Sequence, residues 1–553
     1  MYVVTFLIDQ ISDLYNSSER QMSNYHKRFS DVKHIKPAYI LLLLMGIAGF
    51  LRASDEFSQE IKVMPGNTLS EQKEQAEPES YLLSTMFADS SLQRPLSLEE
   101  VIQLALEHNR ILKRYRLSEQ SAKIRLKQAE YRFLPSAYIT GGRNESRNDD
   151  LGYVIWKKGV SSVFGFSRAL ETGGAVSLSV TNSTSESSNL PGTINYNTNV
   201  GISISQPLLR GAGIRVNMIP IERAKRYARI SLFYVKQSLI NLITAIESQY
   251  WDLILVYEDQ KIQKQALKRA KELLEVNKSL IESGRMAAQE IVQAESDIAT
   301  REIALAAAEN AIISTQVALQ SQLDLGERIL IIPTTEMEFK PVDIRLQDCL
   351  ARAYKNRPDW AIANSYLEIE RMNLIVAKNN NRYTLGSWAS IRSDATSDQA
   401  FANSMRESFG FKSLAWNVGL SFTFPFNKQV LENGYQLNRL SYERQKIWVE
   451  ELKDNIRIQV ENAVRAVQFT LKQVGLAQRA KELASRKLQL EEDKMKVGRS
   501  TNFQVISYQR DLINAQNAEL RAIASYLKAL GQLESTMGTT LQKWGIEVEE
   551  MEE

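Results

Sequence analysis

The sequence predicts an α+β membrane protein in which long coiled-coil helices adjoin a transmembrane β-barrel that several chains share. Three observations predict this class. The chain repeats itself internally, strand-like segments alternate apolar with small polar residues, and helical stretches run much longer than a globular domain needs. The composition agrees with a folded protein, because 44% of the residues are hydrophobic and 24% are charged.

Composition also argues against several function classes. The net charge of +3, from 68 basic and 65 acidic residues, gives no electrostatic reason to expect a nucleic-acid partner. Cys349 is the sole cysteine and the chain has three histidines, which leaves too few ligands for a cysteine-based zinc site or a multi-histidine centre. Carboxylates share helical faces with lysines and arginines, which indicates solvated surface. We therefore expect no catalytic residues, no metal site, no cofactor and no enzymatic activity.

The N-terminus predicts an export signal. Several basic residues precede the apolar run Ala38–Leu51, which is too short to span a bilayer comfortably. We interpret residues 1–53 as a signal peptide that is cleaved near Ala53, with an uncleaved anchor as the alternative. Residues 54–94 are polar and acidic without a sustained period, so we expect a flexible leader there.

The rest of the chain is a tandem repeat. The segment that begins at Leu98 recurs at Leu346 with its apolar and small residues in the same order, and Pro207 corresponds to Pro425. About 30 extra residues precede Pro207 in the first half. The expected domains are repeat 1 at 95–332, repeat 2 at 333–538 and an acidic tail at 539–553.

Strand-like segments occur in both repeats. Around Val176–Val180, Val200–Ile204 and Val418–Phe424, apolar residues alternate with serine, threonine, glycine and asparagine. An apolar face, a small polar face and nearby aromatic residues are typical of transmembrane barrel strands. Weaker alternation near 136–145 and 386–395 supplies the partner strands. We therefore expect two long strands in each half, and because four strands cannot close a barrel, several chains must contribute.

Very long helices follow the strands. Roughly 60 proline-free residues separate Ile221 from Gly284, which is on the order of 95 Å of helix. Gly284 and Gly498 lie at equivalent points of the two repeats, where we expect each chain segment to turn back as a helical hairpin. The second half also carries a seam with heptad spacing, as in helices that pack on other helices. Its members are Val460, Val464, Val467, Leu471 and Val474.

Taken in order, these landmarks resemble the TolC-like family of outer-membrane efflux proteins. The resembling motifs are LSLEEVIQLALEHN near the start of the first half, SQPLLRGAG at 205–213, and a branched apolar residue seven positions after Gly284 and after Gly498. The resemblance extends from about Pro95 to Gly538. It implies a strand-to-helix junction at Pro207, Gly211, Gly213 and Pro425.

The resemblance implies a homotrimer whose subunits each lend four strands to one twelve-stranded barrel in the lipid of the outer membrane. Twelve long helices then form a tunnel through the periplasm of a Gram-negative-type cell. Proteins of this family act with a periplasmic adaptor (membrane fusion) protein and an inner-membrane pump, and they export without doing chemistry. We thus expect a passive exit duct of a tripartite efflux pump or of a type I secretion system, for small molecules or proteins.

The hairpin tips are the expected periplasmic gate. In relatives, acidic residues narrow the tunnel mouth at the second tip, whereas the matching positions here are Gln504 and Ser507. We expect a less cation-selective tip dominated by Arg285 and Arg499, which form either an exposed ring of charge or a latch that holds the tunnel shut. The expected tip and gating residues are Gly284, Arg285, Glu290, Gln293, Gly498, Arg499, Gln504 and Ser507.

Two alternatives stay open. The scarcity of histidine neither supports nor excludes a heavy-metal efflux duct. A trimeric coiled-coil surface scaffold without transport would account for the helices, but it leaves the lipid-like strands and the export signal unexplained. A channel must be extracted from the outer membrane with detergent and must conduct in a planar bilayer, and a scaffold would not conduct.

Overall fold

A computed structural model describes residues 93–548 except 151–152, 188–189, 285, 326–328 and 498. The described residues all lie in one unit, Glu79–Glu553. The expected signal peptide, nearly all of the expected leader, the last residues of the acidic tail, and the tip residues Arg285 and Gly498 lie outside the described residues.

Both halves contain the same order of elements. Each begins with a short strand, a short helix and a longer helix, enters a β-sheet, leaves it through a helix of 69 or 68 residues, and ends in a helix of 34 or 36 residues. The first half comprises β1 (Gln93–Leu96), α4 (Leu98–His108), α5 (Arg110–Glu130), the 3₁₀ turn η2 (Tyr131–Phe133), β2 (Ser136–Asp150), β3 (Tyr153–Ala169), β4 (Ala175–Ser187), β5 (Leu190–Pro207), α6 (Ile214–Glu282) and α7 (Glu290–Leu323). The second comprises β6 (Leu330–Pro333), α8 (Leu346–Asn356), α9 (Pro358–Asn380), β7 (Thr384–Ser397), α10 (Phe401–Phe409), β8 (Leu414–Thr423), α11 (Gln429–Lys496), α12 (Asn502–Met537) and α13 (Thr540–Lys543).

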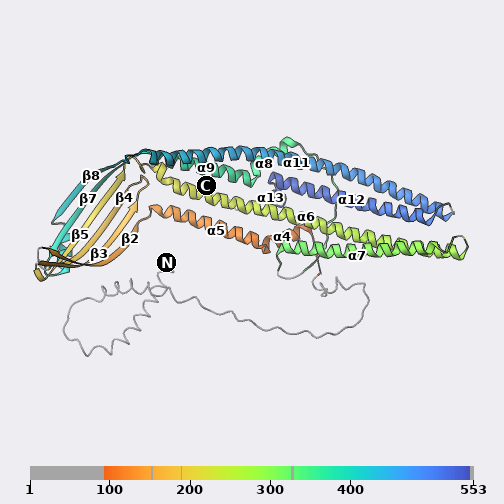
Figure 1. The fold of residues 1–553 in the computed structure, drawn as a ribbon, viewed down its shortest axis with the longest axis horizontal. Coiled ribbons are helices and arrows are strands. Elements are labelled where there is room, and N and C mark those ends of the chain that lie inside the picture. The colour runs from red at the N-terminus through yellow and green to blue at the C-terminus, as the bar shows by residue number, and fades with distance from the viewer. Residues whose placement is uncertain are drawn as a thin grey trace, which may run out of the picture. The chain divides into compact units, whose positions relative to one another are not determined.

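Six of these strands form one antiparallel sheet at one end of the long helices (Figure 1). Their order is β2-β3-β4-β5-β7-β8. Our expectation of two strands in the first half is therefore wrong, because the first half supplies four. The extra residues before Pro207 form most of β3 and β4, and the second half carries α10 in the corresponding connection between β7 and β8.

The first long helix begins earlier than predicted. We expected it to start after Pro220, but α6 begins at Ile214 and contains that proline. A proline near a helix start removes one hydrogen bond to the preceding turn, which the remaining bonds and the packing tolerate here. With 69 residues, α6 is about 100 Å long. The turns that follow α6 and α11 lie at the end of the helices that is remote from the sheet (Figure 1).

Two apolar cores hold the helices together near their middle. One forms around Ile243, Ile246 and Tyr250 of α6, with α4 packed against it. The other joins α11 to α8 and α12 and contains the fully buried Val460 and Tyr526. The heptad seam predicted on α11 lies in this second core, where four of its five members are buried and Leu471 packs against them. That part of the prediction is confirmed.

Candidate transport path

The sheet has a mainly apolar face and a mainly small polar face, and Tyr138, Val163 and Trp388 are large residues that lie on the polar one. Strand register aligns neighbouring residues in rows, and consecutive rows point to opposite faces. One row consists of Phe166, Leu178, Ile202, Ile391 and Trp416. The next row consists of Ser136, Ser167, Ser177, Ser203, Ser390 and Asn417. The large side chains of the first row are between 39% and 74% exposed in the single chain.

The polar face is cross-linked by its own hydroxyl groups. Ser136 and Ser167 share a hydrogen bond of 2.9 Å between their Oγ atoms, and Ser177 and Ser203 share one of 2.7 Å. On the apolar face, β8 carries large side chains from Leu414 to Phe422, which is roughly 27 Å of strand. Allowing for strand tilt, this length suits the apolar band of an outer-membrane barrel, which is about 25 Å tall.

A sharp loop leads from β5 into α6. Gly211 and Gly213 have φ values of +81° and +103°, a region that residues with a Cβ rarely adopt. The side chain of Asn217 donates to the carbonyl oxygens of both glycines, at 2.8 and 3.0 Å. Asn379 of α9 accepts a hydrogen bond of 2.7 Å from the Gly211 N–H. The expected junction residues of the first half therefore lie at a loop that fastens the sheet to two helices.

The turn between β3 and β4 packs against this junction. Gly213 N–H donates to the carbonyl oxygen of Thr172 at 3.0 Å. Gly173 has a φ of +94°, and a Cβ at this position would collide with the Gly211 carbonyl oxygen. The hairpin that sequence reasoning did not foresee is thus part of the support of the junction.

The second junction differs from the first. Pro425 lies between the end of β8 and the start of α11, and the side chain of Asn427 accepts a hydrogen bond of 2.9 Å from the Gln429 N–H. The rings of Phe422, Phe424 and Phe426 contact each other in sequence, the first pair tilted and the second edge-to-face, with centroids 5.6 and 5.7 Å apart. Exposed aromatic rings at the edge of an apolar band are typical of the membrane–water interface.

The first hairpin tip lies between α6 and α7. Gly284 has a φ of +70° and its N–H donates to Ile281 O at 2.8 Å, which closes the last turn of α6. Glu290 begins α7 and Gln293 follows one turn later, and both side chains are half-buried in the single chain. The structure therefore reverses the chain where the sequence predicted a turn.

The second tip contains a carboxylate that sequence reasoning missed. Glu491 is 8% exposed and accepts hydrogen bonds from Ser500 Oγ at 2.7 Å and from Lys494 Nζ at 3.0 Å. These bonds hold the pKa of the Glu491 carboxyl below its ordinary value, with the bond from Ser500 as the largest cause. The neighbouring Arg499 side chain is exposed, and its N–H donates to Lys494 O at 2.9 Å. Glu491 thus ties the end of α11 to the turn.

The two tips contact each other within one chain. Asn502 is buried at the start of α12 and its side-chain amide donates to Glu290 O at 3.5 Å. An apolar cluster joins Val505 and Met495 of the second hairpin to Leu280 and Met286 of the first. Gln504 and Ser507 lie on the same first turns of α12 and are half-buried. The tip residues predicted from two distant parts of the sequence therefore lie side by side.

A buried polar layer lies next to the first tip, between the tip and the sheet end of the helices. Asp297 and Arg301 of α7 form an ion pair of 3.4 Å, and both side chains are less than a tenth exposed. Asn277 of α6 is fully buried, and its side-chain amide has no hydrogen-bond partner within the described part of the chain. The matching Asp511 of the second hairpin is exposed and pairs with Lys487 at 3.0 Å. Polar groups that are buried in this way favour one helix register over its alternatives.

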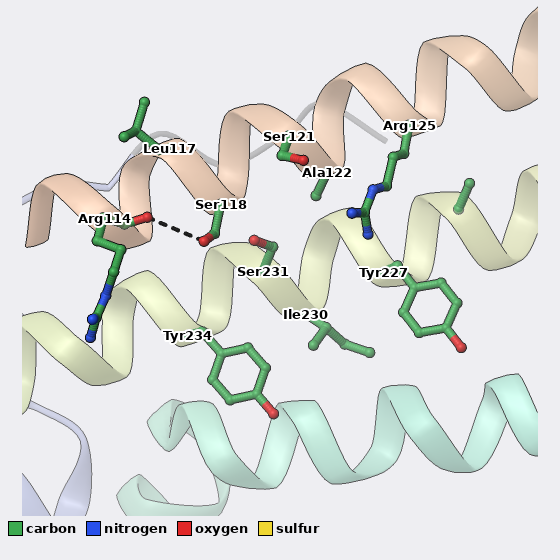
Figure 2. Close-up of a pocket in the computed structure, with 11 residues that line it drawn as sticks. Arg114, Leu117, Ser118, Ser121, Ala122, Arg125, Tyr227, Ile230, Ser231 and Tyr234 are labelled. Atoms are coloured by element: carbon green, nitrogen blue, oxygen red, sulfur yellow. Dashed lines mark hydrogen bonds between the residues drawn. The ribbon is translucent and has the colours of Figure 1, made fainter. Parts of the chain in front are cut away.

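One pocket of the described chain is a groove on the helices rather than an enclosed site. It has a volume of about 570 Å³ and lies between α5 and α6, with Arg114, Arg125, Tyr227 and Tyr234 on its walls (Figure 2). Leu117 on its rim is 65% exposed. Within the described ranges, no three histidine, cysteine or acidic side chains converge in a way that could hold a metal ion. No helix of the described chain is both long and apolar enough to cross a membrane.

Comparison with known proteins supports the family resemblance over part of the chain and shows the fold over most of it. Residues 101–323 match the family described as outer membrane efflux protein. CusC, described by its conformational changes on folding and transmembrane channel formation, is 16% identical over 81% of this chain and 93% of its own, with a TM-score of 0.60. The comparison with curated proteins gave no match.

Two further solved structures share the fold. The CmeC outer membrane channel of Campylobacter jejuni is 16% identical, covers 87% of this chain and 94% of its own, and has a TM-score of 0.59. The open state of the MtrE outer membrane channel of Neisseria gonorrhoeae is 17% identical, covers 82% and 94%, and has a TM-score of 0.56. The resemblance drawn from the sequence is therefore confirmed.

Proposed function

We propose that this chain, which resembles outer membrane efflux proteins, is the passive exit duct of a tripartite efflux pump or of a type I secretion system. Its place in the outer membrane, with the helices in the periplasm, is that of the family. The observation that carries the proposal is a sheet with an apolar and a small polar face, continuous with two helices of 69 and 68 residues.

The duct works by providing a wetted path, without any chemical step. Its proposed lumen is lined mainly by the hydroxyl and amide groups of the polar face, together with the ion pair of Arg392 and Asp394, and such groups hydrate well and bind solutes weakly. Selection of the cargo then falls to an inner-membrane pump, and a periplasmic adaptor links that pump to the hairpin tips. Three copies of the chain enclose the path, because one open sheet would leave unpaired backbone groups in lipid.

Purified protein in mild detergent tests this function directly. We expect a native mass of three chains, and ion conductance after reconstitution into a planar bilayer. A monodisperse monomer would contradict the homotrimer. A trimer that never conducts would contradict the duct and favour the scaffold.

The tip carries the proposed gate, and Arg499 is its best probe. If the guanidinium group latches the tunnel shut, Arg499→Ala raises the open probability. If it contributes to an exposed ring of charge, Arg499→Ala mainly shifts the ion preference toward cations. Single-channel recording with a salt gradient measures both. Strong block of the wild type by low trivalent cation from the tip side would contradict both forms, since it requires an exposed acidic ring.

A further inference from the structure

We infer that each copy of this chain contributes six strands to the barrel wall, and that the edge strand β8 of one copy pairs with β2 of a second copy. The inference rests on the proposed function. It departs from the four strands per subunit that the family resemblance implies. Three copies would then close an eighteen-stranded barrel, whose lumen is wider than that of a twelve-stranded one.

The extra hairpin has the properties of wall strands. β3 is registered with β2 from Tyr153 to Ser167 and with β4 from Lys157 to Ala169, so both strands are paired along nearly their full length. Phe164 and Phe166 lie on the same face as Ile202 and Ile391. A hairpin folded into a wet lumen has no use for an apolar face, whereas a wall strand needs one against lipid.

The two edges of the sheet suit each other. Within the described residues, β2 pairs only with β3 and β8 pairs only with β7. All neighbours are antiparallel and the strand number is even, so β2 and β8 run in opposite directions. Joining the β8 edge of one copy to the β2 edge of the next therefore continues the antiparallel ladder. The same joint repeated in a ring leaves no free edge, which lipid requires.

Strand number sets the width of the barrel. Diameter grows nearly in proportion to strand number, so eighteen strands give a lumen about 1.5 times as wide as twelve and roughly twice the cross-section. Barrels of this size leave an aqueous channel. The polar face is mostly serine, glycine and asparagine, whose short side chains fill little of the lumen, and its larger side chains include Trp388 and Arg392 of β7. The structure therefore points to bulky hydrophilic cargo at the outer-membrane exit, with the narrowest point elsewhere.

A deletion that removes the hairpin tests the strand count. Removing residues 151–189 joins β2 directly to β5. A three-residue turn would place Ala137 of β2 opposite Ile202 of β5, which share a row in the wild-type sheet, so the apolar faces stay aligned. Wild type and variant are compared in planar bilayers, with polyethylene glycols of increasing size added on the outer side. We expect the largest polymer that enters the wild type to have about 1.5 times the radius of the largest that enters the variant. Equal cut-offs in two conducting channels would overturn the inference.

Labelling keeps the inference testable where the deletion variant does not fold. In a Cys349→Ser background, Leu178→Cys and Ser179→Cys place thiols on opposite faces of β4. A membrane-impermeant maleimide should modify the variant at 179 and spare the one at 178. Equal modification of both would overturn the wall position of the hairpin. A wild-type channel that never conducts would instead refute the proposed function, while the labelling result would still decide the position of β4.

Discussion

At the scale of the residue, the face on which a strand side chain lies is its most consequential property. Leu420 pairs across to Ser387 on the apolar face and is 72% exposed in the single chain. Its neighbour Ser421 pairs with Gly386 on the polar face. The alternation in the sequence predicted this arrangement. Successive residues of a strand point to opposite faces, so the face of one residue fixes the face of all the others.

A lysine should therefore be far more harmful at 420 than at 421. Leu420→Lys places a charge toward lipid and should cost roughly 2–4 kcal/mol near the bilayer midplane. Ser421→Lys places the same charge in the proposed wet lumen and should cost much less. The yield of assembled protein extracted from outer membranes measures the difference. Equal losses from the two variants would mean that the faces, or the lipid environment, are wrongly assigned.

Glu491 is a residue whose role could not be predicted from the sequence. In the sequence it is one of two adjacent glutamates, and nothing distinguishes it as the one whose carboxylate receives Ser500 Oγ nine residues later. The contact exists because the chain turns back between α11 and α12. Burial and partners are properties of the folded turn, so charge patterning could not have selected this residue.

The carboxylate should make the second tip sensitive to acid. Because the folded-state pKa of Glu491 lies below the ordinary value of 4.5, its ionised form stabilises the tip above that pH. This contribution is lost as pH falls through the folded-state pKa. We expect Glu491→Gln to unfold at a lower temperature than wild type at pH 7, and by a smaller margin at pH 3. Circular dichroism at 222 nm measures both midpoints, and a gap that is equal at the two pH values would contradict the assignment.

At the scale of the element, long helices and clean strands could be predicted and mixed strands could not. β5 and β8 alternate regularly, so they were expected. β3 was missed because Val163 lies on the opposite face from its neighbour Phe164, and Lys157 and Lys158 are adjacent, which breaks the period of two. The strand forms nevertheless, since β2 and β4 pair with it on both sides. The local sequence pattern did not show that this segment is a strand, and pairing with the neighbouring strands makes it one.

Helical turns offer a matched test at this scale. Gly284 has a φ of +70° and Gly434 lies inside α11, and a Cβ on either would meet no atom within 4 Å. Gly284→Ala should destabilise by about 1 kcal/mol, because the left-handed conformation is strained for alanine. Gly434→Ala should stabilise by roughly 0.5–1 kcal/mol, since alanine favours a helix. Thermal midpoints in detergent measure both, and a midpoint that does not fall in Gly284→Ala would mean that the turn does not need its glycine.

At the scale of the whole molecule, α11 has more apolar surface than its own chain covers. Its predicted seam is buried against α8 and α12. A second set of large apolar side chains repeats every seven residues along the helix and is between 57% and 69% exposed. These residues are Phe469, Leu476, Leu483, Leu490 and Val497. Heptad spacing predicts a helical partner, and within the proposed trimer that partner is a second copy of the chain.

The midpoint of this second stripe should control assembly. Leu483→Glu removes an apolar contact that contributes about 1.5–3 kcal/mol when buried, and it forces a charge into each helix–helix contact between copies. Ser485→Glu adds the same charge to an exposed position of α11 outside the stripe.

We therefore expect Leu483→Glu to shift the native mass in mild detergent from three chains to one, with helicity retained because the buried seam of α11 is unchanged. Ser485→Glu should leave the trimer intact. If Leu483→Glu assembled as well as the serine variant, the stripe would face water or cargo, and the contacts between copies would have to lie in the sheet edges β2 and β8 alone.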